Sequence, residues 1–500
     1  MPLLTRKYFD GIAPFMGALM TLAFAPFDLS FITFFPLAFM FASWRTLTPG
    51  RAAMRGFLFG LGLFGAGVSW VFISVYYFGG REIFSALVAT GIFVVFWALF
   101  PALTGYLIAK TKNNKVRFQL FLMPGIWVLV EYLRGEWVLN GFPWLQVAYS
   151  QITTPLAGYV PIIGVYGTGF IVAVIAYSIL RSLSNWPSFL NRIMLILVLV
   201  LGGAAFRTIE WTSPIGQNIK ISLIQGNISQ DRKWAEDNRD ATLDLYRSIT
   251  RKNWAADIII WPETSIPAYY SDVKETFLKP LESEALEHGA DLIVSLPMKN
   301  ADNSVRYNAV LTLGKTPGIY RKNHLLPFGE YMPLQPVSGY LLQFLNVRLG
   351  NFASGGDDQQ LMRAAGYQFI TSICYEDVFA ITRPELLAQA AFLVNVTNDA
   401  WFGRSIEPYQ HMQIAQMRAL ETGRYLMRAT NTGVTGVVDS KGKIVSEGDL
   451  FKTDVISANI VPMQGVTPYV YIGNETIIAI IMLLTVGEFT GGFFQRNKIS

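Results

Sequence analysis

Long apolar runs alternate with short polar segments over residues 1–210, a pattern typical of membrane-spanning helices. Five runs reach the length of about 20 residues that a helical span needs: 9–27, 56–79, 84–109, 157–180 and 190–206. Three further candidates are shorter, carry charges or follow much later in the chain: 30–44, 118–134 and 475–491. The pattern therefore predicts eight transmembrane helices, with seven in residues 1–210 and the last at 475–491.

The pattern changes between residues 218 and 463, where short β-rich runs alternate with amphipathic stretches. The predicted strands lie at 219–228, 257–261, 291–296, 308–313, 367–374, 392–397, 434–438 and 455–460. The predicted helices lie at 236–252, 279–289 and 408–422. Strands and helices that alternate within one block predict a single α/β domain whose sheets are covered by helices.

Composition supports this division into a membrane part and a soluble part. The chain is 52% hydrophobic and 15% charged, whereas soluble domains average about 25% charged residues. Only six of the 35 acidic residues lie in residues 1–210. The net charge of +5 does not indicate nucleic-acid binding, because the basic residues of this part sit in short loops between apolar runs.

The loop charges predict the orientation of the spans, since Lys and Arg gather in cytoplasmic loops. If the amino terminus is cytoplasmic, the outer loops of the first part hold only Arg81 and Arg134. Eight spans then place both termini in the cytoplasm and residues 218–463 on the opposite side, the periplasm of a Gram-negative cell. The inner loops and termini hold Arg6, Lys7, Arg45, Arg51, Arg55, Lys110, Lys112, Lys115, Arg117, Arg181, Arg192, Arg496 and Lys498.

Two charges fall within or beside the predicted span 118–134. Glu131 and Arg134 are three residues apart, so they share one face of a helix and can pair. Charges at membrane depth usually have a function. The alternative is that this pair only marks the outer end of a span, and the sequence leaves both open.

Cys374 is the only cysteine of the chain, and it follows the apolar, β-branched run 369–373. A thiol at a strand end, where the chain turns, is exposed and close to free backbone N–H groups, as a nucleophile requires. A single cysteine is otherwise most often a small buried hydrophobic residue. Cys374 is therefore a candidate nucleophile whose role depends on its neighbours.

Two further segments place charged side chains after predicted strands. Glu263 follows the buried-type run 258–261 and Pro262, and Lys322 precedes Glu330 by eight residues across a Pro-Phe-Gly turn. Each residue alone would more often be a capping acid or a surface charge. Together with Cys374 they supply what thiol chemistry needs, a base for the thiol and a cation for an oxyanion.

Three motifs carry a family resemblance: Trp261-Pro262-Glu263, Lys322-x-His324-Leu325-x-Pro327-Phe328-Gly329-Glu330 and Cys374-Tyr375-Glu376. In this order they resemble the nitrilase (carbon–nitrogen hydrolase) superfamily with its Glu-Lys-Cys triad. A domain of this kind inserted before the last of eight spans resembles the bacterial apolipoprotein N-acyltransferases, the membrane-embedded branch of that superfamily. The resemblance implies an α-helical membrane bundle of eight helices plus a nitrilase-like αββα sandwich.

The resemblance also implies an activity. The thiol would take an acyl chain from a membrane phospholipid as a thioester and pass it to the α-amino group of diacylglyceryl-cysteine on an apolipoprotein, with ping-pong kinetics. Cys374 would be the nucleophile, Glu263 the general base and Lys322 the oxyanion stabiliser. The expected partners are phospholipid, the diacylated apolipoprotein and the bilayer, without nucleic acid, cofactor or metal, in the bacterial inner membrane.

Further residues match functional positions of the family. Glu330 would orient Lys322, the N–H of Tyr375 would be a second oxyanion donor, and Glu376 would support the site. Substrate-binding roles are expected for Trp234, Trp401 and Phe402, although ordinary packing would explain these aromatic residues as well. His288, His324 and His411 are expected to be unremarkable.

Two alternative functions are open. A membrane-tethered amidase or nitrilase would hydrolyse a small C–N substrate, but one anchor helix would suffice for it. A transporter or sensor with a degenerate outer domain would not need three intact triad residues. Eight spans favour a lipid-facing cavity from which water is excluded, so that acyl transfer outruns thioester hydrolysis.

Overall fold

The computed structural model describes residues 8–111, 120–184, 189–333, 351–381 and 383–496. It divides into two compact units, one of residues 1–76, 81–210 and 472–500 and the other of residues 77–80 and 211–471. Six of the basic residues assigned to the inner loops and termini lie outside the described part: Arg6, Lys7, Lys112, Lys115, Arg117 and Lys498. The first two residues of the predicted span 118–134 do so as well.

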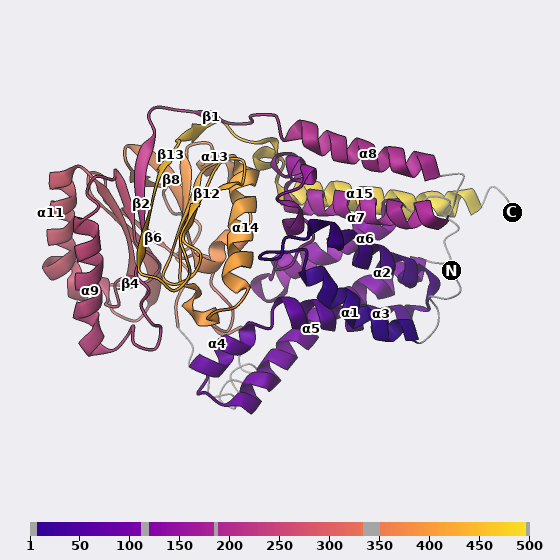
Figure 1. The fold of residues 1–500 in the computed structure, drawn as a ribbon, viewed down its shortest axis with the longest axis horizontal. Helices are drawn as coiled ribbons and strands as arrows, with labels where there is room; N and C mark the ends of the chain where they lie inside the picture. The colour runs from indigo at the N-terminus through magenta and orange to yellow at the C-terminus, as the bar shows by residue number, and fades with distance from the viewer. Residues whose placement is uncertain (1–7, 112–119, 185–188, 334–350, 382, 497–500) are drawn as a thin grey trace. The chain divides into compact units, whose positions relative to one another are not determined.

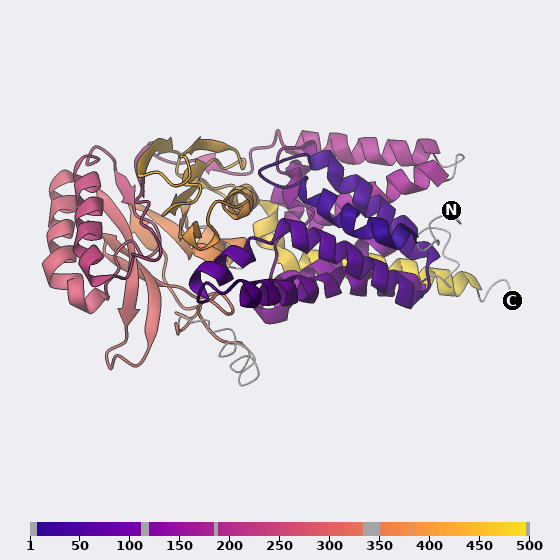
Figure 2. The same cartoon turned by 60° about the horizontal axis from the view of Figure 1, so that its bottom comes forward.

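The first unit is a bundle of helices that run alongside one another (Figures 1 and 2). Its α-helices are α1 Tyr8–Thr21, α2 Phe34–Thr46, α3 Pro49–Gly67, α4 Val71–Phe78, α5 Ile83–Lys110, α6 Leu122–Tyr132, α7 Val160–Ser184 and α8 Phe189–Phe206. The chain returns to this unit in α15, Pro468–Arg496. Short 3-10 or π turns connect several of them: η2 Ser30–Thr33, η4 Leu133–Trp137, η5 Val138–Asn140, η6 Tyr149–Gln151 and η7 Pro155–Tyr159.

Each predicted span coincides with one helix, except that 56–79 falls on the two helices α3 and α4. Not every helix is long enough to cross a bilayer. Among the described residues, four helical segments have the required length and apolarity: Ile83–Lys110, Pro155–Ser182, Phe189–Phe206 and Pro468–Thr490. A fifth exists if α3 and α4, which meet at a bend of 60°, form one broken span. Helices α1, α2 and α6 have 14, 13 and 11 residues, short of the roughly 20 that a straight span needs. Several apolar helices are thus confirmed, and the number eight stays a prediction.

The second unit contains two six-stranded sheets. The first has the order β13-β2-β3-β4-β5-β6, with β2 Ile219–Gln225, β3 Ile258–Ile260, β4 Asp291–Lys299, β5 Arg306–Leu313, β6 Gly318–Arg321 and β13 Asp454–Ile460. The second has the order β12-β11-β10-β9-β8-β7, with β7 Met362–Ala364, β8 Tyr367–Ile373, β9 Phe392–Thr397, β10 Leu426–Thr430, β11 Gly436–Val438 and β12 Ile444–Glu447. The central pairs β2–β3, β3–β4, β8–β9 and β9–β10 are parallel.

Helices cover the outer faces of both sheets, as Figure 1 shows. Helices α9 (Glu236–Arg251) and α11 (Lys279–His288) lie on the first sheet, and α14 (Glu407–Thr422) lies on the second. The two inner faces share one apolar core to which both sheets contribute, for example Ile260 from β3 and Phe369 from β8. The αββα sandwich expected from the sequence is confirmed. Short helical turns complete the unit: α10 Tyr270–Val273, η9 Lys274–Leu278, η10 Cys374–Val378, α13 Pro384–Leu387 and η11 Asp399–Phe402.

The predicted strands of the two large sheets match the structure except at β10 and at three of the four edge strands, β6, β7 and β12. The run 426–430 was not predicted as a strand, yet it lies between β9 and β11 inside the second sheet. Arg428 interrupts the apolar pattern of this run. Its side chain is nevertheless fully buried, because acidic side chains from other elements neutralise its charge. Strands β6, β7 and β12, which the sequence also missed, are three or four residues long and lie at or next to a sheet edge.

Candidate active site

The three residues predicted to form a triad lie at the ends of strands from both sheets. Cys374 follows β8 directly, Lys322 follows β6 directly, and Glu263 comes three residues after β3. The charges of Glu263 and Lys322 both act on the pKa of the Cys374 thiol, so the three groups lie near one another. The structure therefore brings the predicted side chains together, and their chemical roles stay predictions.

Cys374 occupies a strained backbone conformation. Its φ is +53°, in the left-handed region that non-glycine residues rarely adopt and that often marks a functional turn. The turn is held by the Glu376 carboxylate, which accepts the Ile373 N–H at 2.7 Å. Asn395 Nδ2 donates to the Cys374 carbonyl at 3.3 Å. The strained turn is thus held by hydrogen bonds of Glu376 and Asn395. The cysteine itself is half-buried.

The Glu263 carboxyl group is buried, with 8% of the residue exposed. Its Oε1 accepts a hydrogen bond from Asn308 Nδ2 at 2.7 Å. Burial raises the pKa of Glu263, and the positive charge of Lys322 opposes that rise. A carboxylate with a raised pKa accepts a proton more readily near neutral pH, as a general base must.

A second buried lysine lies beside this carboxylate and was not singled out in the sequence. Lys233 is 3% exposed and its Nζ donates to the backbone carbonyl of Glu263 at 3.1 Å. Burial lowers the pKa of Lys233 to about 8, although the charge of Glu263 opposes this. The contact fixes the turn that carries Glu263.

Lys322 is 1% exposed and forms an ion pair with Glu330, with Nζ 2.8 Å from Oε2. Burial disfavours the charge of Lys322, but Glu330, Cys374 and Glu263 raise its pKa above the usual value, so it stays an ammonium ion. For the thiol, the surroundings favour the neutral form. Burial and the charge of Glu263 raise the pKa of Cys374, and Lys322 works against them. Ionisation of this thiol therefore needs both a nearby base and a nearby cation.

Glu376 connects the segment of Lys322 with the turn of Cys374. Its Oε1 accepts hydrogen bonds from the Tyr320 hydroxyl at 2.9 Å and from the N–H groups of Asn323 and His324 at 2.7 and 2.9 Å. The same carboxylate fixes the residue before Cys374. Glu376 thus positions the predicted cation relative to the thiol, which fits the supporting role expected for it.

The aromatic residues expected near the substrate have different surroundings. Tyr375 is 6% exposed, and its ring packs edge-on against Phe379 with 5.3 Å between centroids. Trp234 and Trp401 are 52% and 37% exposed, so both present apolar surface, and Phe402 is half-buried. Exposure is compatible with substrate binding, and the roles of Trp234, Trp401 and Phe402 stay predictions.

A buried network of charged side chains lies behind Cys374, and the expectation that His411 is unremarkable is wrong. His411 Nε2 lies 2.7 Å from Asp377 Oδ1, and Nδ1 lies 3.3 Å from both Asp399 Oδ1 and Glu407 Oε1. Arg428 donates to Asp377 at 2.9 Å and to Asp399 at 3.2 Å. One signal in the sequence pointed here, because Glu407 and His411 are four residues apart on one helix face.

Three members of this network have the side-chain types of a metal site. The ligand atoms of Asp399, Glu407 and His411 lie within 4.8 Å of one another. Carboxylates face both ring nitrogens of His411, and Arg428 forms an ion pair with the carboxylate of Asp399. Since a metal needs a deprotonated imidazole nitrogen and free carboxylate oxygens, this arrangement fits an ion-pair network better than a metal site.

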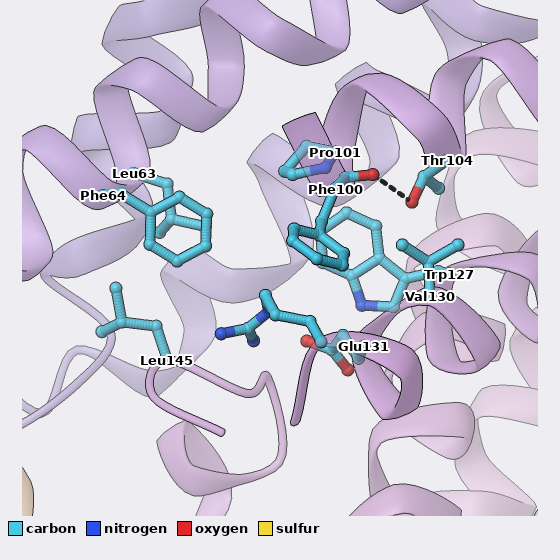
Figure 3. Close-up of a pocket in the computed structure, with 10 residues that line it drawn as sticks. Leu63, Phe64, Phe100, Pro101, Thr104, Trp127, Val130, Glu131 and Leu145 are labelled. Carbon is cyan, nitrogen blue, oxygen red and sulfur yellow. Dashed lines mark hydrogen bonds between the residues drawn. The ribbon is translucent and has the colours of Figure 1, made fainter. Parts of the chain in front are cut away.

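Figure 3 shows a pocket in the helical unit, which includes the two charges noted in the sequence. Arg134 Nη1 donates to the carbonyls of Phe142 and Trp144, both at 2.7 Å, and Glu131 Oε1 accepts the Val147 N–H at 3.3 Å. Both charges therefore bind the backbone of loop 142–147. The pocket is lined by Leu63, Phe64, Phe100, Pro101, Thr104, Trp127, Val130, Glu131, Arg134 and Leu145.

Two family models match the chain, one in each part. Residues 16–178 match the apolipoprotein N-acyltransferase N-terminal domain, and residues 220–468 match the carbon-nitrogen hydrolase family. Among solved structures, Nit3 of Saccharomyces cerevisiae is similar at 19% identity and a TM-score of 0.37, covering 50% of this chain and 92% of its own.

Curated relatives match nearly the whole chain. A protein of Methylococcus capsulatus named apolipoprotein N-acyltransferase is 45% identical over 93% of this chain and 92% of its own length. A protein of Nitrosomonas europaea with the same name is 42% identical over 98% of this chain and 99% of its own length. Since these matches include the helical part, none favours a small-substrate amidase with a simple membrane anchor.

Proposed function

Because the chain belongs to the apolipoprotein N-acyltransferase family, we propose that it transfers a fatty acyl chain from a membrane phospholipid to the amino terminus of apolipoproteins. The observation that carries this proposal is the similarity of both parts of the chain, helical and α/β, to enzymes of that name. The acceptor is the α-amino group of diacylglyceryl-cysteine. The product is an amide, the last covalent change in lipoprotein maturation.

The first half-reaction forms a thioester. Glu263 takes the proton of the Cys374 thiol, and Sγ attacks the ester carbonyl of the phospholipid. Lys322 Nζ and the N–H of Tyr375 stabilise the oxyanion, a type of contact whose loss costs about a hundred- to a thousandfold in rate. The lysophospholipid leaves with the proton from Glu263, and the acyl chain stays on the sulfur.

The second half-reaction uses the same groups in reverse. The lipoprotein amine attacks the thioester carbonyl, Glu263 accepts a proton from the nitrogen, and the oxyanion again lies against Lys322. Collapse of the intermediate breaks the C–S bond, and the thiolate regains its proton. Burial of Glu263 supports this double role, because a carboxyl group with a raised pKa can both accept and return a proton.

The other predicted residues act around this centre. Glu330 keeps Lys322 charged and oriented through their 2.8 Å ion pair, and Glu376 joins the two segments that carry the cation and the thiol. Trp234, Trp401 and Phe402 bind acyl chains or the lipoprotein. The exposed apolar surface of Trp234 and Trp401 supports this assignment.

The placement in the cell completes the proposal. Residues 1–210 form seven transmembrane helices, residues 218–463 form the catalytic domain in the periplasm, and 475–491 is the last span. Both termini lie in the cytoplasm, and the enzyme resides in the bacterial inner membrane. The loop charges and the apolar helices of the first unit support this arrangement.

Mass spectrometry of the intact protein tests the proposal. The full-length protein, purified in detergent and incubated with phospholipid alone, should gain the mass of one fatty acyl group on Cys374. Addition of a synthetic diacylated lipopeptide should remove this mass and yield an acylated lipopeptide.

A Cys374→Ser variant is the matched control, since it should keep its melting temperature and gain no acyl mass. The proposal fails if the parent protein never becomes acylated. It also fails if water removes the acyl group as fast without lipopeptide as with it, because the protein would then be a hydrolase.

A further inference from the structure

Thr397 is a buried hydroxyl residue beside the candidate nucleophile. Strands β8 and β9 are parallel, with Ile373 opposite Val396, so the next residues along both strands, Cys374 and Thr397, lie at the same sheet edge. Thr397 is fully buried, and as a neighbour able to donate a hydrogen bond it favours ionisation of the Cys374 thiol, lowering its pKa. The hydroxyl oxygen of Thr397 lies 3.1 Å from Asp399 Oδ1.

The Thr397 hydroxyl carries one hydrogen, and it has two acceptors within reach. Asp399 always offers a carboxylate oxygen, whereas the sulfur becomes a strong acceptor only as a thiolate. Asp399 does not depend on Thr397, because Arg428 Nη2 lies 3.2 Å and His411 Nδ1 lies 3.3 Å from its carboxylate oxygens. The hydroxyl can therefore turn from Asp399 to the sulfur without leaving a buried carboxylate unpaired.

Charged groups from different elements act on the thiol. Glu263 follows β3, Lys322 follows β6, Asp399 lies on η11 and Arg428 lies on β10. Both carboxylates oppose a negative sulfur, as does burial. Lys322 is already paired with Glu330 and is also needed at the oxyanion. A neutral donor placed directly on the sulfur would therefore favour the thiolate without adding charge.

We propose that Thr397 is a further catalytic residue, whose hydroxyl turns from Asp399 to Cys374 Sγ and stabilises the thiolate. The thiol proton passes to Glu263, while Thr397 keeps its own hydrogen throughout. When the sulfur forms a thioester and loses its negative charge, the hydroxyl returns to Asp399. The inference rests on the proposed function only in taking Cys374 as the nucleophile.

The pH dependence of cysteine alkylation tests this assignment. Cys374 is the only cysteine of the chain, so iodoacetamide uptake by the full-length protein in detergent reports on this sulfur. Thr397→Val keeps the shape of the side chain and removes the donor. We expect its alkylation profile to shift upward by about one pH unit, since a hydrogen bond to a charged group stabilises it to this extent.

Thr397→Ser is the matched control because it retains a hydroxyl, and we expect its profile to stay with that of the parent. An unchanged profile in Thr397→Val would overturn the proposal, as would an equal shift in both variants. Melting temperatures of all three proteins separate a loss of fold from a loss of the donor. Alkylation needs no lipid, so this test remains readable even if the acyl-transfer experiment fails.

Discussion

The two carboxylates that follow Cys374, Glu376 and Asp377, lie in the turn of the proposed nucleophile and have no part in the proposed proton transfers. Glu376 accepts the N–H of the residue before Cys374 at 2.7 Å. Asp377 accepts from Arg428 at 2.9 Å and lies 2.7 Å from His411. Because a non-glycine residue with positive φ is strained, these contacts keep a conformation that the chain would otherwise leave. We therefore expect both acids to position this turn.

Glu407 carries a pH-dependent cost to stability. Burial and the neighbouring charge of Asp399 raise the pKa of Glu407 from 4.5 to about 7, against the attraction of His411 and Arg428. Among the described residues, Glu407 Oε2 has no hydrogen-bond partner. The folded protein therefore binds this proton more tightly than the unfolded chain does. Its stability should fall as the pH rises from about 4.5 to about 7. Glu407→Gln should remove the cost and stabilise the protein above pH 7, by up to about 3 kcal/mol.

Thermal unfolding of the full-length protein at pH 5 and pH 8 measures this effect. The melting temperature of Glu407→Gln should exceed that of the parent at pH 8 and nearly equal it at pH 5. Glu447→Gln on strand β12, where the side chain is exposed, should change neither value. A lower melting temperature of Glu407→Gln at pH 8 would instead show that Glu407 is ionised and pairs with His411.

Helices α3 and α5 approach closely through two glycines spaced four residues apart, a motif that brings membrane helices into contact. A Cβ atom on Gly56 would lie 2.2 Å from the Pro101 carbonyl oxygen, and one on Gly60 would lie 2.6 Å from the Ala98 Cα atom. Since the neighbouring atoms are backbone, they cannot move aside as the end of a side chain would. The packing of these two helices therefore depends on the absence of side chains.

Gly60→Leu should separate α3 from α5, with a loss of at least about 1–3 kcal/mol of stability from overpacking. The matched control is Gly91→Leu on α5, because a Cβ atom there would meet no described residue within 4 Å. We expect Gly91→Leu to keep the melting temperature of the parent in detergent, and Gly60→Leu to lower it clearly. Equal effects of the two substitutions would contradict the close packing of α3 and α5.

For the molecule as a whole, the number of membrane crossings determines the orientation of the second unit. Four described helical segments are long enough to cross a bilayer, and the bent pair α3 and α4 would be a fifth span. Helices α1, α2 and α6 belong to the same unit but are shorter, about 16 to 21 Å at 1.5 Å per residue. Whether each of these crosses decides on which side residues 218–463 lie, because every crossing reverses the side.

Cysteine labelling in intact cells tests the proposed orientation. In a Cys374→Ser background, Ser304→Cys in the exposed loop between β4 and β5 should react with a membrane-impermeant maleimide once the outer membrane is opened. Thr48→Cys, exposed before α3, should react only after the inner membrane is permeabilised. Labelling of both, or the reverse pattern, would contradict the eight-span arrangement.

The sequence determined the elements and the composition of the predicted triad. Hydrophobic periodicity located the helices and most strands, because side chains alternate along a strand and recur every 3.6 residues in a helix. The sequence could single out Glu263, Lys322 and Cys374 as a candidate triad, because each ends or follows an apolar run. The periodicity failed at β10, where Arg428 is buried among charges from other elements.

Only the tertiary structure decided which side chains meet. The register of β8 and β9 places Thr397 at the same sheet edge as Cys374, and His411 meets Asp377 because α14 packs against the second sheet. These contacts join residues far apart in the chain, and no local pattern encodes them. A buried charge is stable only with a partner, and the partner is supplied by the packing of whole elements.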